Sequence, residues 1–408
     1  MIDLSSKSNK NLIFFILILI SVVTIFFLID DLKSNLNAYG EHCLIFYIPI
    51  FLIYIFFFID NHRFFIKLII FLLISYFPII LLNQKIFLNF GDDSFLYLKH
   101  AHYMLENKTL TFTSEKIPYF RQPGSPYFYM FELFFLKFES RLLQVINVII
   151  FFVFYFESLK LINKKILNRN LNLIINLILF LTLPYSITSI LMFNSEWISV
   201  LFIMLSFILF ERKKIFFSIL SLAIIPFIRQ NFLFSSIFVF LLIIILNSKN
   251  KFSFTGYFLS FCIVLLFPIY HNLYFANSFN FFVVYDFHPT TQWPIFINNL
   301  MNFKINENDL NFLISIFYER ISYIFLYNDN MDLENKINAI FVFPGIFLCI
   351  FLSLISLYKK KSFVLLICFL SIYLPTLVGK GYFPRFEYVS VSAFLFFYTI
   401  YQSKYFHK

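Results

Sequence analysis

Charged side chains are scarce in this 408-residue sequence: Asp, Glu, Lys and Arg make up 13% of it, whereas 60% of the residues are hydrophobic. Soluble globular proteins carry about 25% charged and about 45–50% apolar residues. The apolar residues here come in runs of roughly 15–20, the length that a helix needs to cross a hydrocarbon core about 30 Å thick. The sequence therefore predicts one helical membrane domain with inserted loops, and not two or three soluble domains.

Cysteine is also rare, and its spacing excludes the usual cysteine sites. The four cysteines have no C-x-x-C spacing, so neither a metal site nor a disulfide framework is indicated. His100 and His102 would point to different faces of a helix, which disfavours a shared metal ion. A Gly-rich phosphate loop is also missing. We therefore expect no metal, no cofactor and no soluble nucleotide-binding domain.

The start of the chain imitates a secretory signal peptide. Lys7 and Lys10 precede an apolar run over residues 11–29. That run is too long for an ordinary signal peptide, lacks an A-x-A-like cleavage site and ends in Asp30-Asp31. We expect it to be retained as a first membrane span.

The net charge of +10 would suit a protein that binds nucleic acid. The cations flank the apolar runs, however, where lysine and arginine set the orientation of membrane spans. We predict twelve membrane spans, with 11–13 possible. Both termini would then lie in the cytoplasm, and the protein would be a multi-pass protein of the inner or plasma membrane. The spans are placed near 12–29, 42–59, 65–83, 142–161, 171–190, 195–211, 214–228, 231–246, 253–270, 338–357, 362–378 and 386–402. This places on the cytoplasmic side, besides Lys7 and Lys10, the basic clusters Arg63/Lys67, Lys160/Lys164/Lys165/Arg169, Arg212–Lys214, Lys249/Lys251, Lys359–Lys361 and Lys404/Lys408.

The spans divide the chain into five predicted segments. Residues 1–83 hold three spans, 84–141 form a first outer loop, 142–270 hold the central spans, 271–337 form a second outer loop, and 338–408 hold three spans and a short cytoplasmic tail. The stretch 124–138 is apolar but short and carries Glu132 and Lys137. A full crossing there would put the Lys160–Arg169 cluster outside, so we expect an outer-face helix in the membrane interface.

Several polar motifs converge on the outer face in this topology. Each has an ordinary explanation: Asp92 and Asp93 as a solvated loop or helix cap, the Pro-Gly-Ser-Pro run as a turn, Glu196 as a cap, and Arg229 as an interfacial anchor. Charges near membrane depth are nevertheless costly, and an acidic pair with three arginines on one face suits an anionic phosphate ligand and a chemistry that needs a base. The motifs are Gly91-Asp92-Asp93, Arg121-Gln122-Pro123-Gly124-Ser125-Pro126, Asn194-Ser195-Glu196-Trp197, Arg229-Gln230-Asn231 and Gly381-Tyr382-Phe383-Pro384-Arg385-Phe386-Glu387-Tyr388.

The first outer loop resembles that of the C-type (GT-C) glycosyltransferases, especially the bacterial protein mannosyltransferase and lipid A aminoarabinose transferase group. The shared patterns are Asp93-x-x-x-Tyr97-x-x-x-Ala101 followed by Arg121-Gln122-Pro123-Gly124-Ser125-Pro126. Glu196, Arg229 and the Pro384–Tyr388 stretch add shorter agreements in the same order, over about residues 91–402. The chain departs from the group in having two spans before the one that leads to the acidic loop, and Phe386 where Tyr is commoner.

This resemblance implies a GT-C-like helix bundle that moves a sugar from a polyprenyl-phosphate donor to a lipid, glycan or protein acceptor at the outer face. Its reaction would be an inverting transfer. A carboxylate can take the proton of the acceptor hydroxyl, and arginines can hold the phosphate leaving group. We assign Asp93 as the base, because it alone of the two has a tyrosine, Tyr97, four residues later in the chain. Asp92 is the alternative base. The other expected substrate-binding residues are Tyr97, Arg121, Glu196, Arg229, Tyr382 and Arg385, of which Arg229 and Arg385 would bind phosphate.

Two other classes stay open. A surface-polysaccharide polymerase also has many spans and outer-face arginines, but it would need no acidic pair after an early span. A lipid-linked oligosaccharide flippase or other transporter would carry polar residues through the middle of several spans. The predicted span centres are nearly bare of charge, which disfavours the transporter.

Overall fold

The protein is described here from a computed structural model, which covers residues 92–110, 123–137, 140–191, 193–229, 232–247, 251–276, 299, 304–324, 333–360, 365–366 and 383–405. Every regular element in these ranges is an α-helix, and no β-strand occurs in them. The predicted all-α class is therefore confirmed. The predicted spans 12–29, 42–59 and 65–83 lie outside the described residues, as does nearly all of the span 362–378.

The remaining predicted spans each coincide with a helix, within a few residues at each end except at two ends. The span predicted at 253–270 is interrupted at Leu266, and the span predicted at 338–357 begins earlier than expected. The helices are α6 (Ser140–Lys165), α7 (Arg169–Leu191), α8 (Glu196–Glu211), α9 (Ile215–Ile228), α10 (Leu233–Asn247), α11 (Lys251–Leu265), α15 (Leu333–Lys360) and α17 (Phe383–Tyr405).

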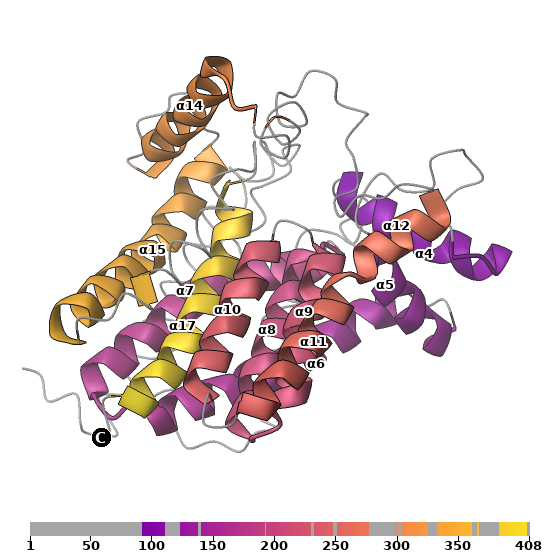
Figure 1. Cartoon of the computed structure of the whole chain (residues 1–408). Helices are drawn as coiled ribbons and strands as arrows, with labels where there is room; N and C mark the ends of the chain where they lie inside the picture. The colour runs from indigo at the N-terminus through magenta and orange to yellow at the C-terminus, as the bar shows by residue number, and fades with distance from the viewer. Residues whose placement is uncertain are drawn as a thin grey trace, which may run out of the picture.

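These helices lie side by side in a bundle around α8 (Figure 1), which packs against α6, α7, α9 and α17. Helix α8 is apolar on all sides and is buried over most of its length, as expected for a helix at the centre of a bundle. Its Phe207 stacks on Phe396 of α17 with ring centroids 5.4 Å apart. Helix α15 approaches the bundle closely at Gly345, where an added Cβ would lie 2.7 Å from a methyl of Val391 and 3.0 Å from Ile178.

The two ends of the bundle differ in charge. At one end Lys165 of α6 pairs with Glu211 of α8 at 2.7 Å, and Arg212 approaches Glu157 at 4.0 Å. The predicted cytoplasmic clusters of the α6–α7 and α8–α9 connections therefore meet at this end. Helix α17 also ends at this end of the bundle (Figure 1).

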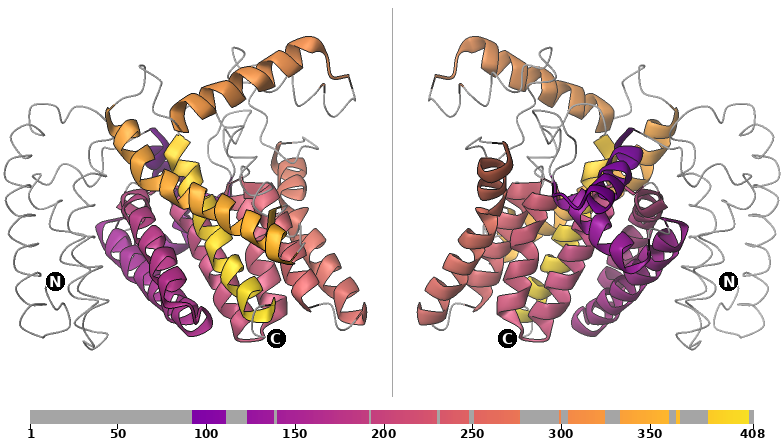
Figure 2. Two further views of the ribbon diagram at one scale, coloured as in Figure 1. Left: turned by 90° about the vertical axis from the view of Figure 1, so that its left-hand side faces the viewer. Right: turned by 90° about the vertical axis from the view of Figure 1, so that its right-hand side faces the viewer.

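Four further helices lie toward the opposite end. They are α4 (Asp92–Asn107), α5 (Gly124–Phe135), α12 (Phe267–Ala276) and α14 (Glu307–Ile324). Helices α4 and α5 pack on each other, and α5 also contacts α6 and α9. Figure 2 shows α14 lying across this end of the bundle. Helix α5 is separate from α6, in agreement with the separate helix predicted over 124–138.

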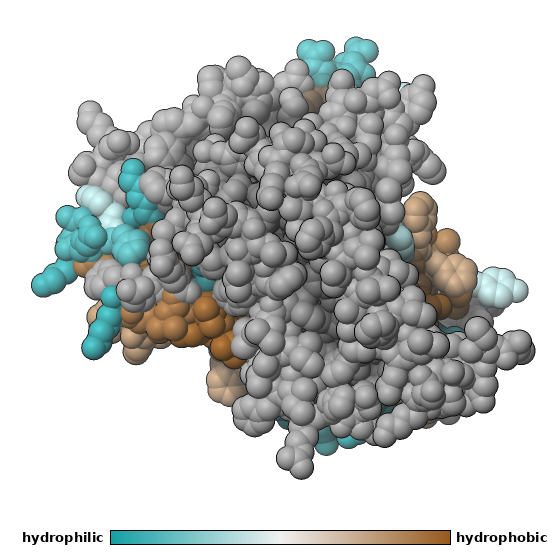
Figure 3. Space-filling model, turned by 180° about the vertical axis from the view of Figure 1, so that it is seen from behind, coloured by the Kyte–Doolittle hydropathy of each residue, from teal (hydrophilic) through white to brown (hydrophobic). Residues whose placement is uncertain are grey.

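Two described helical stretches, Leu142–Lys165 and Thr255–Phe275, are long and apolar enough to cross a membrane. Helices α8, α9 and α10 have 16, 14 and 15 residues, so at 1.5 Å per residue they span only about 21–24 Å. The count of twelve spans therefore stays a prediction. Large apolar side chains are exposed on α15 and α5, and Figure 3 shows such patches on the described surface.

Candidate functional site

The first sequence motif forms one face of α4. Tyr97, Ala101 and Met104 follow one another at helical spacing and are 2%, 0% and 1% exposed. Asp92 and Asp93 lie in the first turn of this helix, where carboxylates are favoured by the helix dipole. The spacing from Asp93 to Tyr97 is therefore one helical turn along α4.

Helix α9 ends beside α4, and its last turn is shaped by a proline. Pro226 has no N–H to donate to the carbonyl of Leu222, which would be its partner in an unbroken helix. The hydroxyl of Ser236 on α10 donates to this carbonyl instead. The helix then ends at Ile228, and the backbone of Arg229 is extended, with its N–H donating to the carbonyl of Ile225 at 2.8 Å.

The Pro-Gly-Ser-Pro run of the second motif packs α5 against this last turn. A Cβ added at Gly124 would lie 2.5 Å from the carbonyl oxygen of Phe227, so only glycine fits there. The Ser125 hydroxyl donates to the carbonyl of Ile228 at 3.2 Å, which satisfies one of the free carbonyls at the helix end. The Pro-Gly-Ser-Pro run is therefore more than a turn, because its Gly124 and Ser125 also pack against the end of α9.

The start of α8 is held from two sides. Trp197 Nε1 donates to the Tyr129 hydroxyl at 2.9 Å, and this hydroxyl donates in turn to the carbonyl of Asn194 at 2.8 Å. On the other side, the backbone N–H of Trp197 donates to the Ser189 hydroxyl of α7 at 3.3 Å. Burial raises the pKa of Tyr129 well above 10, so its hydroxyl stays protonated and keeps its donor. The Asn194–Glu196 segment is therefore fixed by α5 and α7.

Arg229 joins three helices through its guanidinium group. Its Nη2 lies 3.2 Å from Oε1 of Glu196 at the start of α8. Its Nη1 donates to the hydroxyl of Tyr97 on α4 and to the hydroxyl of Ser195, both at 3.1 Å. We call these four residues, Tyr97, Ser195, Glu196 and Arg229, the arginine cluster.

Burial and helix dipoles both act on the arginine cluster. The Glu196 side chain is fully buried, whereas the Arg229 side chain is 16% exposed, so the cluster reaches the surface through its arginine. Glu196 stands at the positive end of the α8 dipole and Arg229 at the negative end of the α9 dipole, so each charge is favoured where it lies. The cluster therefore holds one guanidinium group in a fixed orientation near the surface.

The structure thus brings together three of the residues predicted for the site: Tyr97, Glu196 and Arg229. The backbone of Asp93 is one turn from Tyr97, and Arg385 lies in the first turn of α17. Phe396, which stacks on Phe207, follows Arg385 by as many residues as Phe207 follows Glu196. Because α8 and α17 run in the same direction (Figure 1), the backbone of Arg385 lies at about the level of Glu196. Arg121 and Tyr382 lie outside the described residues.

Sequence reasoning named Ser195 only as part of a motif, and missed Tyr129 and the role of Gly124. Ser195 occupies the N-cap position of α8, where a serine hydroxyl normally bonds to the helix backbone. Here it makes no capping bond, and accepts from Arg229 instead. The only signal in the sequence was its place directly before Glu196. Tyr129 gave no signal, because one tyrosine among 25 in a chain rich in Phe is indistinguishable from a packing residue.

The arginine cluster can bind an anion at the exposed edge of Arg229 or act as a clamp between α4, α8 and α9. Within the described ranges, no group of three His, Cys, Asp or Glu residues is placed to hold a metal ion. The conclusion about activity therefore has to come from these residues themselves, because comparisons with protein-family models, curated proteins and solved structures gave no match.

Proposed function

We propose that the chain is a membrane glycosyltransferase of the C-type architecture, with twelve spans. It moves a sugar from a polyprenyl-phosphate donor to an acceptor at the outer, periplasmic face. The observation that carries the proposal is the arginine cluster, which joins residues of three separate motifs through one guanidinium group. It lies at the end of the bundle opposite the basic clusters around Lys165 and Arg212, and the positive-inside rule assigns those clusters to the cytoplasm.

Arg229 binds the phosphate of the donor in this proposal. Arginine offers five N–H donors in a planar fork, and its bonds to phosphate oxygens are charge-assisted. Glu196, Ser195 and Tyr97 hold two of its nitrogens, so the guanidinium is oriented before the donor arrives. Glu196, which the sequence predicted only as a substrate-binding residue, thus orients the arginine in this proposal. Arg385, at about the same level of the bundle, is the second phosphate ligand.

Asp93 is the general base in this mechanism. The acceptor hydroxyl transfers its proton to the carboxylate as its oxygen forms a bond to the anomeric carbon of the sugar. The bond from that carbon to the phosphate oxygen breaks, and its electron pair leaves with the phosphate, which Arg229 and Arg385 stabilise. Attack opposite the leaving group inverts the anomeric centre. One helical turn, about 5–6 Å along α4, separates Asp93 from Tyr97, which contacts Arg229.

The exchange of a single carboxylate for an amide tests the proposal. Asp93→Asn keeps the shape of the side chain but cannot accept the proton, so transfer should slow by about 10²–10⁴-fold. Binding of the donor should persist, because it depends on the arginines and the lipid chain. The assay compares transfer rates and donor binding in membranes supplied with a panel of labelled polyprenyl-phosphate sugars.

Asp92→Asn is the matched control, since it makes the same change one residue earlier in the same turn of α4. We expect it to have the milder effect. An inactive Asp92→Asn beside an active Asp93→Asn would exchange the two roles. Normal transfer by both variants would refute the mechanism and favour a polymerase, which needs no acidic pair.

A further inference from the structure

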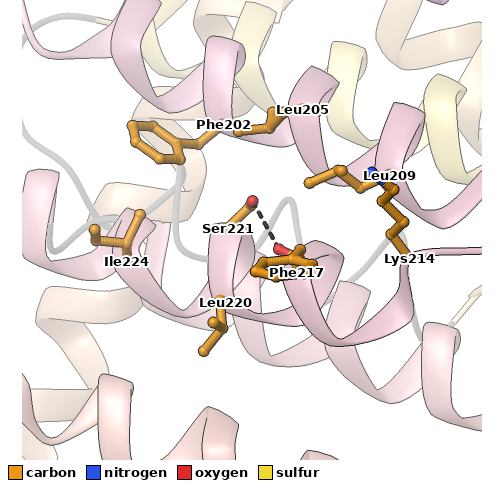
Figure 4. Close-up of a pocket in the computed structure, with 8 residues that line it drawn as sticks. All are labelled: Phe202, Leu205, Leu209, Lys214, Phe217, Leu220, Ser221 and Ile224. Atoms are coloured by element: carbon orange, nitrogen blue, oxygen red, sulfur yellow. Dashed lines mark hydrogen bonds between the residues drawn. The ribbon is translucent and has the colours of Figure 1, made fainter. Parts of the chain in front are cut away.

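An apolar groove runs between α8 and α9 on the basic side of the bundle (Figure 4). Its volume is about 430 Å³, and it is lined by Phe202, Leu205, Leu209, Lys214, Phe217, Leu220, Ser221 and Ile224. This volume falls in the range of sites that hold small molecules, about 300–1,000 Å³. The groove is separate from the arginine cluster, which lies beyond the other end of these two helices.

Each helix contributes one stripe to the groove. Phe202, Leu205 and Leu209 lie on one face of α8, and Phe217, Ser221 and Ile224 lie on one face of α9. At 1.5 Å per residue, each stripe covers about 10 Å of helix. A bilayer with a hydrocarbon core of about 30 Å offers about 15 Å per leaflet. The groove therefore fits within a single leaflet.

The walls of the groove offer hardly any hydrogen bond to a ligand. The Ser221 hydroxyl already donates to the carbonyl of Phe217 at 2.8 Å, as Figure 4 shows. The other lining side chains are hydrocarbon, apart from Lys214. A polar small molecule would lose its hydration there without compensation, so the occupant has to be apolar over most of its length.

The lysine end of the groove carries a surplus of positive charge. Arg212, Lys213 and Lys214 follow one another in the tight connection from α8 to α9, and all three are exposed. Nearby carboxylates have other partners, since Glu211 pairs with Lys165 and Glu157 with Lys160 and Arg212. In the part of the chain that the structure describes, neither Lys213 nor Lys214 pairs with a carboxylate. An anionic group at this end would compensate these charges.

We propose that this groove binds one anionic phospholipid, with an acyl chain between α8 and α9 and its phosphate on Lys214 and Lys213. The apolar walls match the chain, the length matches one leaflet, and the two lysines match the headgroup. Basic sites at the cytoplasmic ends of membrane helices bind anionic headgroups by this combination. The proposal requires that α8 and α9 lie in a bilayer, but it does not depend on the transferase activity.

Lipid retention on the full-length chain tests the proposal. The detergent-solubilised protein is incubated with equal amounts of dioleoyl phosphatidylglycerol and dioleoyl phosphatidylcholine, and bound lipid is measured by native mass spectrometry. We expect one phosphatidylglycerol per chain, retained in preference to phosphatidylcholine. Lys214→Gln should weaken this retention about fivefold, since a lysine near a lipid headgroup contributes about 1 kcal/mol. Lys213→Gln together with Lys214→Gln should weaken it about 25-fold.

Two controls separate the groove from general charge. Lys164→Gln removes an exposed lysine at the same end of the bundle but outside the groove, and should leave retention unchanged. Ser221→Phe fills the groove and should remove the bound lipid while a monodisperse elution profile shows that the fold is kept. Glycerol phosphate, which has the headgroup charge without acyl chains, should not compete.

Three results would overturn the lipid site. They are equal retention by wild type and Lys214→Gln, equal loss with Lys164→Gln, and equal binding of the two lipids. Because the lysine variants change only exposed side chains, they remain informative if Ser221→Phe fails to fold. A chain that retains phosphatidylglycerol as described but transfers no sugar would contradict the proposed function alone.

Discussion

Removing Arg229 should destabilise the end of the bundle that holds the arginine cluster more than the loss of an exposed ion pair would. Arg229→Ala deletes a 3.2 Å contact to Glu196 and two 3.1 Å hydrogen bonds, and so removes from a fully buried carboxylate the cation of this ion pair. Breaking a buried pair from one side typically costs about 3–5 kcal/mol. We expect a loss of that size in the free energy of unfolding, measured by titration with sodium dodecyl sulfate in mixed micelles.

A double-mutant cycle shows whether the loss comes from the pair itself. Glu196→Gln removes the buried charge, so Arg229→Ala should cost less in its presence, with a coupling of about 0.5–3 kcal/mol. Lys160→Ala is the matched control. It breaks the exposed pair with Glu157, 2.8 Å apart, and should cost less than about 1 kcal/mol. A loss below 1 kcal/mol for Arg229→Ala, or strictly additive losses in the cycle, would refute the reasoning.

Three further measurements address other parts of the chain. Gly124→Ala places a Cβ 2.5 Å from the backbone of α9 and should lower the free energy of unfolding by about 1–3 kcal/mol, as overpacking does. An unchanged midpoint of the unfolding transition would show that α5 does not pack this closely. Burial raises the pKa of Glu132 to about 8 from 4.5, so the folded chain holds this proton at pH values where the unfolded chain has lost it. The free energy of unfolding should therefore fall by about 1.4 kcal/mol per pH unit as the pH rises from 4.5 to 8. Glu132→Gln should flatten this part of the curve of stability against pH, and an unaltered slope would contradict the shift. In a chain without its four native cysteines, Ser114→Cys and Asn308→Cys should react with an impermeant reagent from outside, and Ser248→Cys only from inside; protection of Ser114→Cys would overturn the topology.

The helices were predictable because their signals are local. The run from Ile215 to Ile228 is uninterrupted hydrocarbon apart from Ser218, Ser221 and Pro226, and it follows three consecutive cations. Such a run in such a context forms a helix whatever its neighbours are, so α9 was placed to within a residue. The exception is the span predicted at 253–270, where two helices meet at Leu266. Pro268 lies two residues after this break, but the hydropathy of the whole run resembles that of an unbroken span.

Part of the candidate site was predictable for a different reason. Glu196 and Arg229 are charges within an apolar chain, and such charges need partners, so each could be singled out without its partner being known. Their convergence on one face followed from the topology that the lysines and arginines indicate. Which atoms meet did not follow, because Tyr97 and Arg229 are far apart in the sequence and no local pattern joins them.

The sequence by itself determined the all-helical class, the positions of the helices and the candidate polar residues, because each depends on neighbours within one or two helical turns. Only the tertiary structure decided that Gly124 lies against the backbone of α9, that Tyr129 holds the start of α8, and that Ser195 turns its hydroxyl from the helix to Arg229. These contacts depend on where three helices meet. Side-chain packing over long sequence separations sets that meeting point, and neither composition nor periodicity encodes it in a readable form.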